Sequence, residues 1–198
     1  MENVITQLAV GEILDGRYFY IPAYQRGYRW TEKQMGDLLE DLLCFANDKK
    51  KENDFYCLQP IIARRITEEG KLREIYKNTD VSLLKEKGVW EIVDGQQRLT
   101  SIYLLYKYLL SKKGWDEKTL KEEEDGKELY HLLYETREDS ASFLENISLD
   151  TLENGQDFNN NIDFYHITSA FRYIDSWIKD RGKQINLRYE LGGSLDAV

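Results

Sequence analysis

The stretch VWEIVDGQQRLT, residues 89–100, passes from an apolar run of β type through a polar turn into a helical pattern. The apolar run predicts a strand over Val89 to Val93. The apolar spacing that follows predicts an amphipathic helix from Gln96 to near Gly114. Five polar or flexible residues, Asp94 to Arg98, therefore lie at a strand-to-helix turn, where they either cap the helix or hold an anion.

Two interpretations of this turn stay open on spacing alone. In the first, Asp94 caps the helix, Gln97 completes a capping box three residues later and Arg98 is solvated. In the second, Gly95 permits a tight turn, the free N–H groups at the helix start bind phosphate, and Arg98 adds a planar cation. Because caps are common and anion sites are rare, the spacing by itself favours the cap.

Composition indicates a soluble globular protein, since 41% of the 198 residues are hydrophobic and 32% are charged. No apolar run approaches the roughly 20 residues that cross a bilayer, and the first residues lack the pattern of a signal peptide. We therefore expect a cytoplasmic protein with no membrane partner. Cys44 and Cys57 both lie in apolar patterns, which predicts two buried, reduced thiols.

Charge limits the functions that the chain can have. The formal net charge is -9, whereas a protein that binds nucleic acid by general electrostatics is basic. Acidic residues crowd 117–128 and 135–139. An anion site is therefore expected in the first half of the chain, which holds Arg17, Arg26, Arg29, Arg64, Arg65, Arg73 and Arg98.

Before residue 77 we expect short strands and one strong helix. Tyr18 to Ile21 predicts a strand that Pro22 ends, because proline cannot donate to a sheet ladder. Thr31 as N-cap, with Gln34 reaching back to it, predicts the start of an amphipathic helix. Further strands are predicted over 55–58 and 61–63, and a hairpin over 66–72 with its turn at residues 69–70.

After residue 77 the sequence predicts less. Residues 77–88 form a polar insertion whose secondary structure the sequence does not predict, and 112–127 form a charged connector. The remainder is predicted to be helical, with an inner face that includes Phe171 and Trp177. Residues 191–198 have little to pack and resemble the edge of a piece cut from a longer chain.

A second polar stretch, IPAYQRGYRW at residues 21–30, places Arg26 and Arg29 among aromatic residues that include Tyr24. One account is a loop whose rings pack on the following helix while the arginines face water. The other account is a binding surface, in which rings stack on a planar base and arginines hold phosphate. The two accounts are about equally supported by the residues.

Other catalytic patterns are absent from the sequence. His131 and His166 are the only histidines, too few and too far apart to predict a metal site or a histidine-based nuclease centre. The chain has no GxxxxGK[ST] phosphate loop, no CxxC and no HExxH. We therefore expect no DNA-cutting centre within this chain.

Four stretches together resemble the N-terminal region of GmrSD-type modification-dependent restriction endonucleases: IPAYQRGYRW, DGQQRLTSIYLL, YETREDSASFL and NIDFYHITSAF. The resemblance runs roughly from residue 5 to residue 178. It implies an α+β fold with a ParB/sulfiredoxin-like mixed-sheet core over residues 1–112, which would bind nucleotide. It also implies a helical extension over 113–198, truncated before a C-terminal nuclease domain that is missing here or lies on a partner chain.

The same resemblance implies an NTP-hydrolysing regulatory domain of an anti-phage restriction system that acts on modified DNA. The nucleotide (GTP, ATP or CTP) is undetermined. The alternative is a non-catalytic DNA-sensing module that holds a DNA phosphate in the same groove.

Roles for individual residues follow from the resemblance. Gly95 and Arg98 would hold the phosphates, and Asp94 would hold Mg²⁺ or orient a water. Gln96 or Gln97 would position the attacking water. The second wall of the nucleotide site would consist of Tyr24, Gln25 and Arg26.

Overall fold

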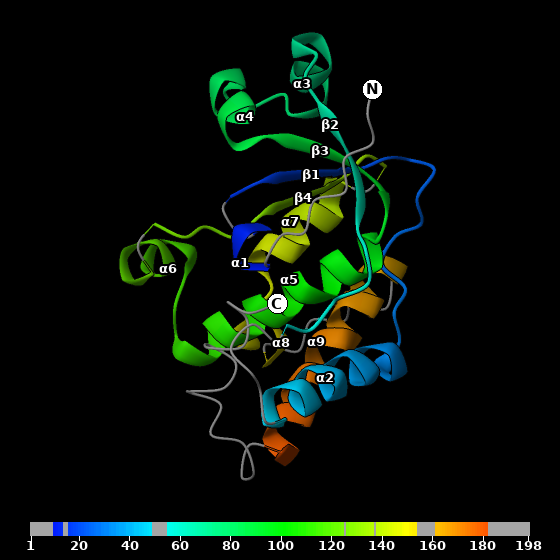
Figure 1. The fold of residues 1–198 in the computed structure, drawn as a ribbon, viewed down its shortest axis with the longest axis vertical. Coiled ribbons are helices and arrows are strands. Elements are labelled where there is room, and N and C mark those ends of the chain that lie inside the picture. The colour runs from blue at the N-terminus through cyan, green and yellow to red at the C-terminus, as the bar shows by residue number, and fades with distance from the viewer. Residues whose placement is uncertain are drawn as a thin grey trace.

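The computed structural model describes residues 10–13, 16–48, 55–124, 126–136, 138–153 and 161–181. Helices surround a mixed sheet whose strand order is β2-β3-β1-β4 (Figure 1). This arrangement confirms the predicted α+β class, whereas the likeness to the ParB and sulfiredoxin core stays a prediction. The strands are β1 (Tyr18–Ile21), β2 (Ile62–Ile66), β3 (Val89–Asp94) and β4 (His131–Tyr134).

Strand β1 lies at the centre of the parallel part of the sheet. It pairs in parallel with β3, with Tyr18 opposite Val89, and in parallel with β4, with Tyr18 opposite His131. Strand β2 is antiparallel to β3. All four residues of β1 are buried, as expected for a strand covered on both faces. The carboxyl ends of β1, β3 and β4 consequently lie at one edge of the sheet.

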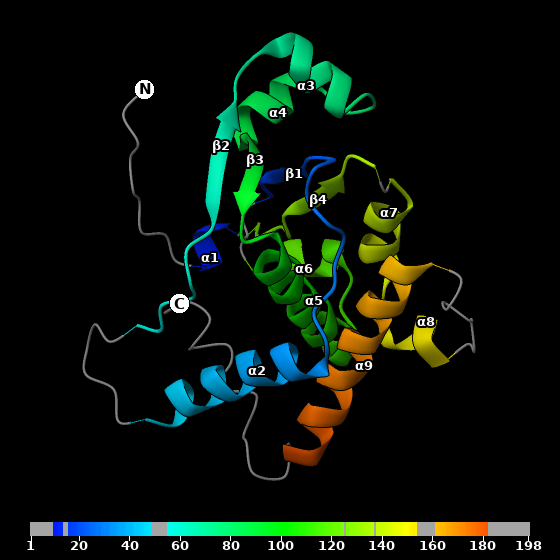
Figure 2. The same ribbon diagram turned by 90° about the vertical axis from the view of Figure 1, so that its right-hand side faces the viewer.

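Helices cover both faces of the sheet. On one face, Phe19 and Ile21 join the main core with residues of α2, α5 and α9; on the other, Tyr18 and Tyr20 pack with α3 and α4. Figures 1 and 2 show α3 and α4 at one end of the molecule and α2 at the other. The helices are α1 (Val10–Ile13), α2 (Glu32–Asn47), α3 (Glu69–Ile75), α4 (Val81–Lys87), α5 (Gln96–Lys113), α6 (Glu117–Glu123), α7 (Glu138–Asn146), α8 (Leu149–Glu153) and α9 (Ile162–Arg181).

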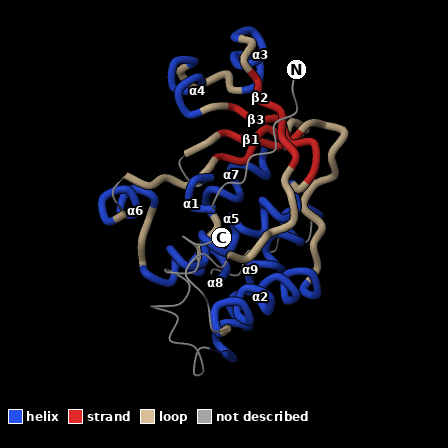
Figure 3. Tube along the Cα trace, in the orientation of Figure 1, coloured by secondary structure: helices blue, strands red, loops and turns tan. Residues whose placement is uncertain are grey.

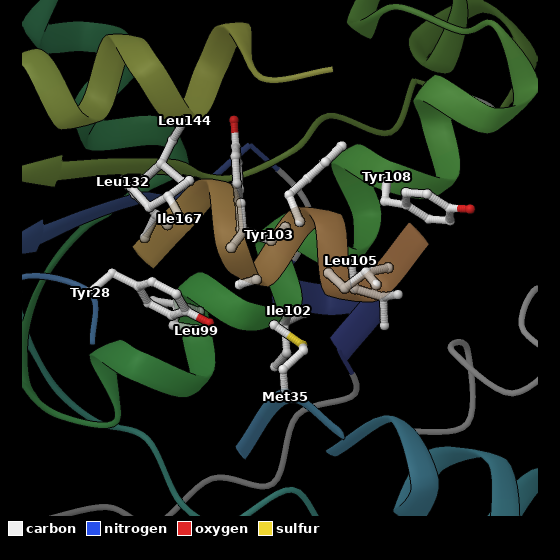
Figure 4. Packing of buried hydrophobic residues seen from close by; sticks show 14 of the residues in the cluster. Tyr28, Met35, Leu99, Ile102, Tyr103, Leu105, Tyr108, Leu132, Leu144 and Ile167 are labelled. Atoms are coloured by element: carbon white, nitrogen blue, oxygen red, sulfur yellow. The ribbon is translucent and has the colours of Figure 1, made fainter. Parts of the chain in front are cut away.

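The central helix α5 confirms the prediction made from residues 89–100. It begins at Gln96 and ends before Gly114, which adopts the left-handed conformation with φ of 69°. Leu104 and Tyr108 of α5 are fully buried. Figure 4 shows Leu99, Ile102, Tyr103, Leu105 and Tyr108 of this helix in the main core.

The predicted strand at Tyr18 to Ile21 and the predicted helix start at Thr31 are also confirmed. The backbone N–H of Thr31 donates to Gln34 Oε1 at 2.8 Å, so the expected reach-back contact forms. Strand β1 ends directly before Pro22. These elements carry strong local signals, which tertiary packing does not override.

One prediction on the α3 and α4 side of the sheet is wrong, because the hairpin expected over 66–72 gives way to helix α3. The polar insertion at 77–88, whose form the sequence left open, contains helix α4. Leu72 of α3 and Leu84 of α4 are buried against the sheet. Asp80 caps α4 by accepting a hydrogen bond of 2.7 Å from the backbone N–H of Ser82.

The expectation that the remainder is helical is wrong at residues 131–134, which form β4. Strand β4 is the outermost strand of the sheet and pairs with β1. It lies in the sequence after residue 112, where the sheet core was expected to end. Leu132 and Tyr134 are buried in the main core. These four residues form a strand because they pair with β1, a partner that no pattern within 131–134 contains. Helix α6 likewise lies within the expected connector.

Two further expectations near residue 57 are wrong. Residues 55–61 have neither helix nor strand (Figure 3), and β2 begins only at Ile62 because Pro60 precedes it. Cys44 and Cys57 are free, as expected, but both are exposed rather than buried.

The stretch 191–198 lies outside the described residues. None of the described helices is both long enough and apolar enough to cross a membrane.

We predict that Gly95→Ala destabilises the protein more than Gly114→Ala. Both glycines have positive φ, 95° and 69°, where an alanine costs about 1 kcal/mol or more. A Cβ at Gly95 would lie 3.1 Å from both Cα and Cγ1 of Ile61, whereas a Cβ at Gly114 meets nothing within 4 Å. Urea unfolding of both variants measures the difference, and equal losses would contradict a close approach of Ile61.

Candidate functional site

The segments that follow the three parallel strands meet at one edge of the sheet. Residues 22–30 follow β1, residues 95–98 follow β3 and residues 135–136 follow β4. Glu135 Oε2 accepts a hydrogen bond from Ala23 N at 2.6 Å, and Gln25 Nε2 donates to Val93 O at 2.6 Å. Ligands of open α/β sheets bind outside the carboxyl ends of the strands, so this edge is the candidate site.

The turn between β3 and α5 does not have the expected cap. Gly95 is the N-cap residue, with φ of 95°, and as a glycine it has no side chain to cap the helix start. Asp94 is exposed, and the predicted capping box between Asp94 and Gln97 is wrong because the Gln97 side chain turns elsewhere. The positive end of an 18-residue helix therefore begins directly beyond an exposed carboxylate.

Gln97 instead binds the segment that follows β1. Its Oε1 accepts from Arg29 N at 2.8 Å, and its Nε2 donates to Gly27 O at 2.9 Å. One helical turn further, Ser101 Oγ shares a buried hydrogen bond of 2.9 Å with the Tyr28 hydroxyl. Figure 2 shows this segment passing along α5 on its way to α2. Both polar groups of the Gln97 amide are thus engaged in holding residues 27–29.

The start of α9 also joins the site. Asp163 is buried and pairs with Arg29 Nη1, which also donates to Tyr28 O at 2.5 Å. Burial lowers the pKa of His166, and the nearby Arg29 guanidinium lowers it further. A hydrogen bond with the backbone of Trp30 and the charge of Asp163 raise this pKa but do not outweigh the first two effects. Arg29 is therefore a structural cation with its own carboxylate.

The remaining predicted residues differ in their surroundings. Arg98, expected to be solvated if the turn were only a cap, is half-buried and donates from Nη1 to Pro60 O at 2.7 Å and to Gln59 O at 3.3 Å. Gln96 is buried with 6% exposure. Arg26 is exposed, and Tyr24 is 67% exposed. The structure thus brings the two predicted polar stretches together at one place.

Among the described residues, no three His, Cys, Asp or Glu side chains gather as a metal site. The His131 ring stacks on Tyr18 with the ring centroids 4.3 Å apart, at the start of β1 and so at the opposite end of that strand from the candidate site. Asp94 is thus the carboxylate of the β3–α5 turn that could hold a cation together with a bound phosphate.

Comparison with known families follows this geometry. A family model described as GmrSD restriction endonuclease, N-terminal domain, matches residues 8–192. The chain belongs to this family. It is therefore part of a restriction system. No curated protein matches the chain.

Some contacts of this GmrSD N-terminal domain were not foreseen from its sequence. Glu135 and Asp163 each fix the segment after β1, by way of Ala23 and Arg29. The signal that could have identified Glu135 is its place directly after a short apolar stretch, much as Asp94 comes directly after the stretch 89–93. It depended on recognising β4 as a strand.

We predict that Gln97→Met destabilises this GmrSD domain by roughly 2–4 kcal/mol, because it leaves the part-buried N–H of Arg29 and the buried carbonyl of Gly27 without their partner. Gln96→Met is the matched control. Gln96 is equally buried, and no described residue bonds its amide, so its loss should cost less than about 1 kcal/mol. Urea unfolding compares the two, and equal effects would show that Gln97 does not hold the segment.

The lowered pKa of His166 predicts a pH dependence. Because the folded pKa lies below the unfolded value of about 6.5, neutral His166 contributes stability that is fully present above that pH. The contribution is lost as the pH falls through the folded pKa. His166→Gln should therefore flatten the fall of the thermal midpoint as the pH drops below about 6.5. A folded-state NMR titration of His166 above 6.5 would contradict this.

Proposed function

We propose that this domain binds a nucleoside triphosphate at the turn between β3 and α5 and hydrolyses it. Hydrolysis would regulate the cleavage of modified DNA by a nuclease domain elsewhere in the restriction system. One observation carries the proposal. The exposed carboxylate of Asp94 is separated from the start of α5 only by the N-cap Gly95, at the edge of the sheet where the segments after β1 and β4 also lie.

The phosphates would lie at the start of α5. The first N–H groups of a helix have no partner within the helix, and its dipole is positive at that end. Arg98 supports this placement, because its bonds to Gln59 and Pro60 use Nη1 and leave Nε and Nη2 for phosphate oxygens. The exposed Arg26 adds a second cation.

If phosphate binds beside Asp94, a cation is needed there, because the carboxylate and the phosphate are both negative and repel one another at close range. Mg²⁺ fits, since it is commonly held by one or two carboxylates together with substrate phosphates. Bound there, it would neutralise charge that develops on the transferred phosphate. Asp94 would hold it, and Gln96 would orient the attacking water, because the amide of Gln97 is already engaged.

Calorimetric titration with GTP, ATP and CTP tests this proposal. With Mg²⁺ present, we expect at least one nucleotide to bind, and Arg98→Ala to weaken it at least tenfold through the loss of a charge-assisted contact. The matched control is Arg73→Ala. Arg73 is an exposed arginine of α3 paired with Glu69, and its loss should leave the affinity unchanged.

Chelation of Mg²⁺ with EDTA should weaken binding by the wild-type protein but have little effect on Asp94→Asn. Unchanged affinity in Arg98→Ala would refute the phosphate assignment. If no nucleotide binds and the protein binds DNA with an affinity that falls steeply with salt, the domain is a non-catalytic DNA-sensing module instead.

A further inference from the structure

Exposed apolar side chains lie directly beside the proposed phosphate turn. Tyr24 is 67% exposed, Ile62 52% and Val93 44%. Val93 immediately precedes Asp94, and Ile62 is paired with Asp94 across β2 and β3. Gln25, the neighbour of Tyr24, donates a hydrogen bond to Val93 O. We call Tyr24, Ile62 and Val93 the apolar platform.

This exposure is local to one end of the two strands. Elsewhere on β2 and β3, Ile66, Val89 and Ile92 are buried, at 7%, 1% and 0% exposure. Single exposed apolar residues are common on protein surfaces. Three of them, drawn from two strand ends and the segment after β1, instead mark a surface suited to a ligand.

Charged groups bound the platform on two sides. Toward the middle of the sheet, the buried Glu91 carboxylate accepts from Arg64 at 2.8 Å and from Lys71 at 2.9 Å. Burial raises the pKa of Glu91, but these two hydrogen bonds outweigh that effect and lower it. Toward α5 lie Asp94 and the helix start. A ligand that lies here therefore has a flat apolar part and a charged end.

The geometry points to the apolar platform as the binding site for the base of the nucleotide. The base would stack on the Tyr24 ring, and the phosphates of the nucleotide would extend to the start of α5. This inference rests on the proposed function. Val93 and Asp94 are consecutive, so their Cα atoms are about 3.8 Å apart, and the platform begins within the span of one nucleotide from the phosphates. Stacking on aromatic rings accepts every base, because each has a π-face.

Calorimetry with two classes of ligand separates the base from the phosphates. Inorganic tripolyphosphate and nucleoside triphosphates are titrated, with Mg²⁺, into the wild-type protein, Tyr24→Ala and Tyr24→Phe. We expect Tyr24→Ala to weaken nucleotide binding roughly tenfold and to leave tripolyphosphate unchanged. Tyr24→Phe should retain the wild-type affinity for both ligands, since it keeps the ring. The matched control is Tyr165→Ala, which removes a 49% exposed tyrosine of α9.

Several results would overturn the inference. If wild-type protein binds tripolyphosphate as tightly as nucleotide, or if Tyr24→Ala weakens both ligands equally, the base makes no contact with the platform, yet the phosphate site stands. If Tyr24→Ala weakens binding of a single-stranded oligonucleotide but not of a free nucleotide, the platform serves DNA instead. If neither tripolyphosphate nor nucleotide binds, both this inference and the proposed function fail.

Discussion

The parallel pairing of β1 with both β3 and β4 is the constraint on which the candidate site depends. Parallel neighbours run in one direction, so each strand delivers its following segment to the same edge of the sheet. Residues 22–30, 95–98 and 135–136 are far apart in sequence and meet there for this reason alone. An antiparallel β1 would have sent residues 22–30 to the opposite edge, away from α5 and Asp94.

Side chains then fix what the strand directions bring together. The amide of Gln97 bonds two backbone groups of residues 27–29, and Asp163 neutralises Arg29 from the start of α9. A backbone segment held in this way has already lost its conformational freedom before a ligand arrives. The segment after β1 is therefore pre-organised, and Tyr24 and Arg26, which lie within it and remain exposed, are presented from a fixed support.

Sequence and structure agree where local signals are strong and differ where long-range pairing decides. The strand at 89–93, the helix from Gln96 and the capped start of α2 follow from spacing and caps, which are local. Strand β4 exists because it pairs with β1, and no pattern within 131–134 contains that partner. The role of Gln97 was missed for the same reason. Its spacing from Asp94 fits a capping box, yet its partners lie about seventy positions earlier.

The distribution of arginines explains how an acidic chain can still offer an anion site. With a net charge of -9, the domain repels anions at long range, and any site must be local. The carboxylate of Asp163 pairs with Arg29, and the carboxylate of Glu91 pairs with Arg64. The segments at the carboxyl edge of the sheet also carry the exposed Arg26, the half-buried Arg98 and the start of α5. A helix start with arginines in the neighbouring segments would suit one compact polyphosphate better than the long, evenly charged backbone of DNA, which is why we propose a nucleotide as the ligand.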